Sequence, residues 1–327
     1  MSTPSPQEKA FAIVFAVVAS LWLFELGLRL FGPEVHSFNN MLSEYDSNPR
    51  DYFDEIRKEG ESAVYGIRQR TDLGLGGRIG DDGARDQRPA QILGLGDSQA
   101  QGQGVRSTDT FYAKLARSLD VGVRNAAVDG YDLEEVIARY AYETSGGQRY
   151  PIVIYALVLD DFGLDRSRIK GLDFIQYQPG HAFDGWRQRS AIWNFVSHLA
   201  EQARLSEETT GAYLDAYTGP AFETQVSKLV RLDAQVRADG GTFFVAVLPL
   251  LYDFENYPFT TIHSQLNALS ASHNLNIIDL LHGLNTHAAD ALWVHPTDHH
   301  PNEIAHSEVA ATLAREIRAS GAATTHR

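Results

Sequence analysis

The stretch GLGDSQAQGQGV, residues 94–105, places one serine, Ser98, directly after the apolar run Ile92 and Leu93. A serine on a strand-to-helix turn can act as a nucleophile, because Gly96 permits a sharp turn and the first N–H groups of a helix are free. A phosphate-binding loop needs a lysine that this stretch lacks, and its glycines depart from the dinucleotide-binding spacing. The other interpretation is an ordinary turn with a capping serine.

A second stretch, WVHPTDHHPNEIAH at 293–306, could supply the partners that such a serine needs. Asp298 and His300 lie in a predicted turn that Pro301 closes, just before an amphipathic helix. A serine nucleophile requires a base to accept its proton and a carboxylate to orient that base. A metal cluster is the alternative use of Asp298 with the other histidines of the stretch, His295, His299 and His306. We favour the catalytic pair and expect no metal and no cofactor.

The elements that would position these residues follow an alternating pattern. From residue 90 onward, short apolar runs alternate with amphipathic stretches, which is typical of a parallel sheet covered on both faces. We predict strands in QILGLG, VGVRNAAV, PIVIYALVL, TFFVAVLP and LNIIDLL, with helices between them. The predicted fold class is α/β, a three-layer α/β/α sandwich. Ligands of such sheets bind beyond the carboxyl ends of the strands, which points to the segments after Gly94, Val128, Leu159 and Pro249.

Composition narrows the possible partners and the domain boundaries. The net charge of −14 disfavours nucleic acid as a partner, and the absence of cysteine excludes disulfides, thiolate metal sites and cysteine nucleophiles. We expect one main domain at 88–321, preceded by a lead-in at 33–87 that packs on it and followed by a tail at 322–327. The interval 162–206 is expected to form either a lid over the site or a surface excursion that ends in a packed helix.

The N-terminus predicts contact with a membrane. Residues 10–32 are almost continuously apolar, interrupted by Glu25 and Arg29, and they are about as long as the ~20 residues that cross a bilayer. We predict a short tail and a membrane anchor helix within 1–32, with the large domain outside the cytoplasm. A cleaved signal peptide and a buried core helix are the alternatives.

The two chemical stretches also carry a family resemblance. GLGDSQAQGQGV and DHHPNEIAH resemble the first and last signature blocks of the SGNH hydrolases, or GDSL family, and the segment LPLLYDFENYPFTTIHSQLNALSASHNLNIIDLL is similar to its membrane-linked bacterial branch. The resemblance covers roughly residues 88–320. It implies a flavodoxin-like sheet, Ser98 as nucleophile, His300 as base and Asp298 as its acidic partner. The family more often has three steps from Asp to His, whereas this chain has two.

The resemblance also implies an oxyanion hole, in which this chain departs from the family. The backbone N–H groups of Ser98 and of Gly130, in NAAVDGYD, match two donors, but Asp160 stands where the family has an asparagine. An ionised carboxylate cannot donate a hydrogen bond. Three possibilities follow. Asp160 is protonated and still donates a hydrogen bond, or this donor is lost and the enzyme is slower, or the protein binds its ligand without turnover.

These expectations combine into one predicted function with two alternatives. The prediction is a serine esterase that hydrolyses acyl esters, with O-acetyl esters of cell-envelope glycans as the substrate class that the resemblance implies. The alternatives are an O-acyltransferase that modifies a surface polysaccharide and a catalytically weak binding or scaffold protein of the cell envelope. Three residues on the same loops are expected to contact the substrate: Tyr131, Asp161 and His299.

Overall fold

The computed structural model describes residues 5–31, 67–70, 75–78, 89–164, 190–295 and 298–322; only the backbone is described at 31, 67–70, 75–78, 107, 194–206, 295 and 298. The chain divides into two compact units. The first consists of residues 1–44 and 170–209, and the second of residues 45–169 and 210–327.

The centre of the second unit is a five-stranded sheet in which all strands run parallel. Its order is β4-β3-β5-β6-β7, with bounds Gly122–Asn125, Ala90–Gly96, Ile152–Val158, Thr242–Leu248 and Asn276–Asp279. Every residue of β5 is buried, as expected for a central strand of β-branched and apolar residues that is covered on both faces. The predicted parallel sheet and its five strands are confirmed.

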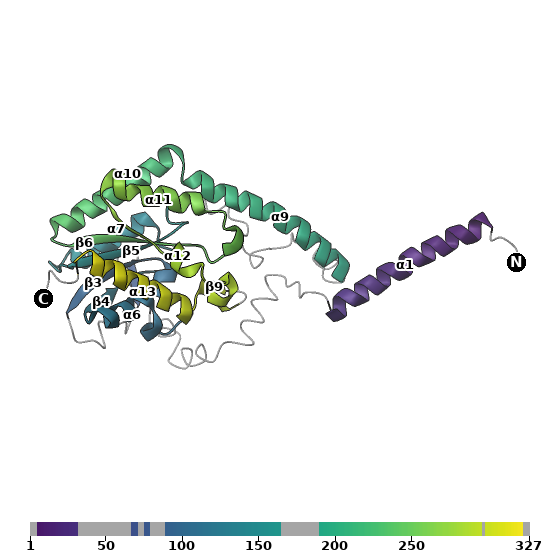
Figure 1. Cartoon of the computed structure of the whole chain (residues 1–327), viewed down its shortest axis with the longest axis horizontal. Coiled ribbons are helices and arrows are strands. Elements are labelled where there is room, and N and C mark those ends of the chain that lie inside the picture. Colours follow the sequence, from purple (N-terminus) through teal and green to yellow (C-terminus); the bar gives the residue numbers. More distant parts are fainter. Residues whose placement is uncertain are drawn as a thin grey trace. The chain divides into compact units, whose positions relative to one another are not determined.

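Helices cover both faces of this sheet, which confirms the predicted three layers (Figure 1). On one side lie α6, α12 and α13, with bounds Phe111–Leu119, Leu281–Leu284 and Glu303–Ala319. On the other side lie α7, α10 and α11, with bounds Leu133–Thr144, Gly219–Ala238 and Thr260–His273. Apolar residues of α6 and α13 form one core cluster with the strands, and fully buried members include Phe111, Leu115 and Leu313. Each such side chain stabilises the fold by roughly 2 kcal/mol.

Short elements join these layers. They are α5 (Ser98–Gln101), the 3-10 turns at Ser107–Asp109, Phe254–Asn256 and Ala289–Leu292, and an antiparallel hairpin of β8 (Trp293–His295) and β9 (Asp298–Pro301). The sequence predicts a simple turn before α13, whereas the structure has this hairpin, so the predicted turn is wrong. Trp293 pairs with Pro301 across this hairpin, which carries His299 and His300.

The lead-in and the predicted lid fall mostly outside the described residues. Within the lead-in at 33–87, the described parts are the antiparallel strands β1 (Ile67–Arg70) and β2 (Leu75–Arg78). Within the interval 162–206, residues 165–189 lie outside the described part, and the remainder leads into α9 (Ala191–Ala216).

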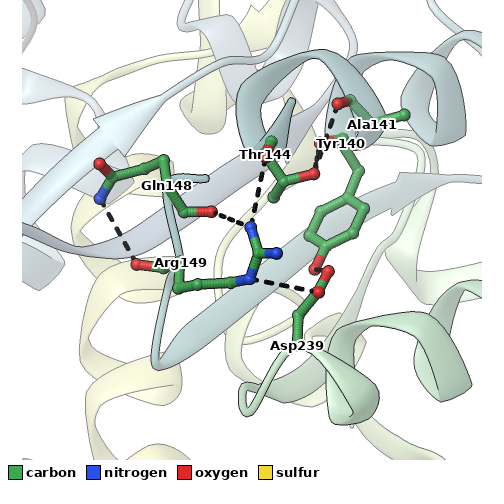
Figure 2. Close-up of polar contacts among 6 residues, drawn as sticks. All are labelled: Tyr140, Ala141, Thr144, Gln148, Arg149 and Asp239. Carbon is green, nitrogen blue, oxygen red and sulfur yellow. Dashed lines mark hydrogen bonds and ion pairs between the residues drawn. The ribbon is translucent and has the colours of Figure 1, made fainter. Parts of the chain in front are cut away.

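A polar cluster fastens the edge of the sheet where the strands begin (Figure 2). Asp239, at the end of α10, accepts a hydrogen bond of 2.7 Å from the buried Tyr140 of α7 and pairs with Arg149 at 3.2 Å. Arg149 also donates to the carbonyl oxygen of Thr144 at 3.3 Å. Because these residues precede β5 and β6 or end the helices before them, the cluster lies at the opposite edge from Ser98, which follows β3.

The first unit contains α1 (Pro6–Phe31). Its segment Pro6–Leu30 has a mean hydropathy of 2.2, and it is the one helix among the described residues that is long and apolar enough to cross a membrane. Length and composition alone do not separate an anchor from a signal sequence.

Candidate active site

Ser98 is the first residue of α5, at the carboxyl end of β3. Asp97 caps this short helix, since its carboxylate accepts a hydrogen bond of 2.9 Å from the Gln99 N–H. Gly96 has a φ of +146°, and a Cβ atom there would lie 2.7 Å from the Ala100 side chain and 2.8 Å from the Ala156 oxygen. Only glycine fits this turn, which therefore sets the position of the Ser98 hydroxyl.

The structure brings His300 to Ser98 across 202 residues of sequence. The His300 Nε2 atom lies 2.9 Å from the Ser98 Oγ atom. This is hydrogen-bonding distance, so an imidazole with an unprotonated Nε2 can accept the hydroxyl proton directly. Ser98 is buried and His300 is half-buried. The backbone of Asp298 lies on the same strand, β9, and its side chain lies outside the described part of the structure.

Asn302 attaches the hairpin that carries His300 to the last helix. Its side-chain amide donates to the carbonyl oxygens of Ala291 at 2.8 Å and Trp293 at 3.1 Å. Its carbonyl oxygen accepts from the N–H groups of Ile304 and Ala305 and so caps α13. The buried Asn302 side chain thus holds the β8–β9 hairpin, which carries His300, at the start of α13.

Two backbone N–H groups, those of Ser98 and Gly130, are the predicted donors of an oxyanion hole. Val128 donates to the Gly96 oxygen at 3.0 Å, which extends the β3–β4 pairing and carries Gly130 toward the turn at Ser98. Gly130 has a φ of +75° with open space around it. Among the described residues, neither the Gly130 N–H nor the Ser98 N–H donates to another group. Both are available to a ligand.

Three carboxyl groups gather next to the serine. Asp97, Asp160 and Asp161 offer oxygen atoms that all lie within 4.8 Å of one another. Burial raises the pKa of Asp97 to about 7; the charge of Asp160 adds to the rise, and His300 opposes it. Burial, followed by the charges of Asp97 and Asp160, also raises the pKa of Asp161 well above its ordinary value. Carboxylates so close in a buried place cannot all be ionised, so the cluster holds at least one proton at neutral pH.

The same cluster is the one group among the described residues with the spacing of a metal site. One Asp161 oxygen accepts hydrogen bonds from the Tyr155 hydroxyl at 2.9 Å and the Val158 N–H at 3.0 Å, and the other is buried without a hydrogen-bond partner among the described residues. The absence of a metal here stays a prediction.

The predicted substrate contacts have different surroundings. Asp161 is 1% exposed, and its carboxylate accepts a hydrogen bond from the Tyr155 hydroxyl of β5, so its contact with substrate stays a prediction. Tyr131 is also buried, next to Gly130, and its role stays a prediction. The His299 ring stacks on Trp293 with centroids 3.6 Å apart and an interplanar angle of 11°. His306 is fully buried and accepts a hydrogen bond of 3.1 Å from the Phe111 N–H, which is a packing role.

Sequence reasoning missed two residues of this site. Asp97 was not singled out, although an aspartate directly before a helix start is a capping signal and its neighbour is the nucleophile candidate. Trp293 supports His299 and donates through its ring N–H to the Leu251 oxygen at 2.8 Å. No local pattern in the sequence indicates that contact.

Replacement of Asp97 by asparagine is expected to reduce the loss of stability at rising pH. The folded-state pKa of Asp97 is raised, so the folded chain binds more protons than the unfolded chain between the ordinary pKa and about 7. Stability is therefore full below the ordinary pKa and falls as pH rises to about 7, by on the order of a few kcal/mol. The Asp97→Asn variant would keep the cap without the charge. Thermal unfolding at pH 5 and pH 8 measures the difference; parallel pH curves for the two proteins would contradict it.

Comparisons with known proteins give distant likenesses. No family model matches the chain, and no curated protein matches it. Among solved structures, a member of the lipolytic protein G-D-S-L family from Veillonella parvula is 15% identical, with a TM-score of 0.43 over 69% of this chain and 97% of that one. A catalytic mutant of an acetylxylan esterase from Geobacillus stearothermophilus is 15% identical, with a TM-score of 0.41 over 70% and 94%. A family two carbohydrate esterase from Clostridium thermocellum is 14% identical, with a TM-score of 0.43 over 71% and 65%. Likenesses at this level are too distant to assign an activity.

Proposed function

We propose that the protein is a serine esterase of the SGNH hydrolase type, with Ser98 as nucleophile and His300 as base. The observation that carries this proposal is the 2.9 Å contact between the Ser98 hydroxyl and the His300 imidazole. The contact lies at the carboxyl edge of a parallel sheet, where ligands of such folds bind. The sequence also predicts both residues as a catalytic pair, from the types and the spacing of the residues around them.

The reaction would proceed through a covalent acyl-enzyme. The Ser98 Oγ atom attacks the ester carbonyl carbon while His300 Nε2 takes the hydroxyl proton. When the tetrahedral intermediate collapses, the ester C–O bond breaks and His300 returns the proton to the leaving alcohol. Water, activated by the same imidazole, then attacks the acyl-enzyme and releases the carboxylic acid and free Ser98. Asp298 is proposed to orient His300 and to stabilise its charged form.

Negative charge on the intermediate would be stabilised by three donors. The N–H groups of Ser98 and Gly130 supply two, and we propose the carboxylic acid form of Asp160 as the third. The closeness of Asp160 to the carboxyl groups of Asp97 and Asp161 supports this role, because neighbouring carboxyl groups can share a proton and a protonated carboxyl group donates a hydrogen bond as the amide of an asparagine does. One such donor is worth roughly 3 to 4 kcal/mol in comparable sites.

Replacement of Asp160 by asparagine is expected to preserve activity at neutral pH and to extend it to higher pH. In the wild type this donor exists only while Asp160 carries a proton, so it is lost when the three neighbouring carboxyl groups ionise at rising pH. An amide donates at every pH, so D160N should exceed the wild type in kcat by up to roughly 100-fold at alkaline pH. Profiles of kcat/KM and kcat against pH test this. Asp129→Asn, which removes an exposed charge nearby, is the matched control. Equal alkaline limbs for D160N and wild type would disprove the donor role.

The substrate class is proposed to be O-acetyl esters of cell-envelope glycans. The test is acetate release from an acetylated glycan and from p-nitrophenyl acetate, with and without a non-acetylated glycan as acceptor. Hydrolysis with no transfer to the acceptor supports the esterase. Acetyl transfer in preference to hydrolysis would instead identify an O-acyltransferase, and no turnover of any ester would favour a binding protein.

The helix α1 is proposed to anchor the protein in a membrane, with the large domain outside the cytoplasm. Its apolar side chains are exposed rather than packed in a core, with Phe11 at 73% and Trp22 at 72% exposed. None of its most apolar window is buried, which separates it from the core helix of a globular domain. Retention in membranes after alkaline carbonate extraction tests the anchor.

A further inference from the structure

The apolar helix α1 carries one carboxylate that binds the start of α9. Within the first unit, Glu25 accepts hydrogen bonds from the N–H groups of Ala191 at 2.7 Å and Ile192 at 2.9 Å, and from the Ser190 hydroxyl at 3.1 Å. Figure 1 shows the carboxyl end of α1 meeting the first turn of α9. Glu25 thus makes a polar contact with residues that lie 165 or more positions further along the chain.

These contacts are those of a helix cap supplied by another helix. The first N–H groups of a helix have no partner inside the helix, and the helix dipole favours an anion there. Glu25 satisfies two of these groups, and the Ser190 hydroxyl accepts from a third, the Trp193 N–H, at 3.2 Å. Arg29, one turn further along α1, pairs with Glu25 at 2.6 Å. The carboxylate is therefore shared between its own helix and α9.

The depth of Glu25 along α1 matches the surface of a bilayer. No charged residue lies between Lys9 and Glu25, and a helix rises about 24 Å over that interval. This rise nearly spans the roughly 30 Å hydrocarbon core of a bilayer, and the long lysine side chain can extend to the opposite interface. Two tryptophans flank the contact, Trp22 on α1 and Trp193 on α9, which are 72% and 45% exposed. Tryptophan is enriched where the hydrocarbon ends and the headgroups begin.

We propose that Glu25 holds the first turn of α9 at the bilayer surface, where Trp193 enters the lipid interface. The protein then has a second membrane contact besides α1. This inference rests on the proposed anchor. The proposal also implies that α1 is retained in the mature protein, because removal of α1 would leave the first turn of α9 without its cap.

The absence of cysteine allows a direct test. Trp193→Cys and, as the matched control further along the same helix, the exposed Glu207→Cys are each labelled with an environment-sensitive fluorophore. The full chain is reconstituted in phosphatidylcholine vesicles that contain a lipid with a nitroxide on its headgroup. We expect quenching at position 193 and little at position 207. Adding Glu25→Ala should bring the signal at 193 to the level at 207, whereas Glu8→Ala, elsewhere on α1, should leave it unchanged.

Hydrogen exchange gives a second readout at the same contact. The amides of residues 191 and 192 should exchange roughly tenfold faster in Glu25→Ala than in wild type, as expected when a helix loses its cap. Equal quenching at positions 193 and 207, or no response of both measurements to Glu25→Ala in a chain that stays in the vesicles, would overturn the inference alone. Release of the wild type by carbonate, or a mature N-terminus beyond residue 32, would overturn the anchor together with it.

Discussion

Ser98→Ala is expected to lower kcat for ester hydrolysis by a factor of roughly 10⁴ to 10⁶ while the protein stays folded. Without the Oγ atom no acyl-enzyme can form, and the proposed oxyanion donors would leave only a residual rate. The hydroxyl faces His300 and makes no other described side-chain contact, so its loss should shift the unfolding temperature little. Steady-state kinetics with p-nitrophenyl acetate and thermal unfolding measure the two effects.

An exposed serine provides the control for this prediction. Ser270 lies on α11, away from the carboxyl edge of the sheet, and Ser270→Ala should leave kcat unchanged. If Ser98→Ala kept more than a small fraction of wild-type turnover, Ser98 would not be the nucleophile.

Gly96→Ala is expected to destabilise the fold by about 4 kcal/mol, from both crowding and backbone strain. Its Cβ atom would contact Ala100 and the Ala156 oxygen at distances that real side chains do not reach, and a φ of +146° is unfavourable for alanine. The turn that orients Ser98 must then shift, so activity should fall with stability. Denaturant unfolding and kcat/KM measure these losses.

Gly147→Ala separates the two causes. Gly147 has a φ of +83°, but no atom lies within 4 Å of the added Cβ, so strain alone should cost about 1 kcal/mol without effect on activity. Equal losses for the two variants would show that the Gly96 turn has no special packing constraint.

The sheet was predictable because each central strand is a short apolar run between amphipathic helices. The β-branched residues of β5 and the apolar run of β6 mark buried strands by composition alone. The helix α11, Thr260–His273, occupies one of the stretches between strands where a helix is predicted. The spacing of apolar residues is a local feature of the sequence, so these elements can be predicted without knowledge of tertiary contacts.

The surroundings of the site were less predictable because they depend on contacts between distant segments. The β8–β9 hairpin forms around a buried Asn302, whose amide pairing with Ala291 and Trp293 leaves no pattern in the sequence. The meeting of Asp97 with Asp160 and Asp161 follows from the neighbouring positions of β3 and β5 in the sheet. A role for Glu25 beyond an interruption of the apolar run became visible only through α9.

The most direct test of Ser98 as the nucleophile is reaction of the full chain with a fluorophosphonate, followed by mass spectrometry of its peptides. An activated Ser98 displaces fluoride from phosphorus through its Oγ atom, so one stoichiometric adduct is expected on the peptide that contains Ser98. The adduct should form much more slowly in His300→Ala and be absent in Ser98→Ala. An unmodified Ser98 under conditions that label a known serine hydrolase, or an adduct on another residue, would show that Ser98 is not the activated nucleophile.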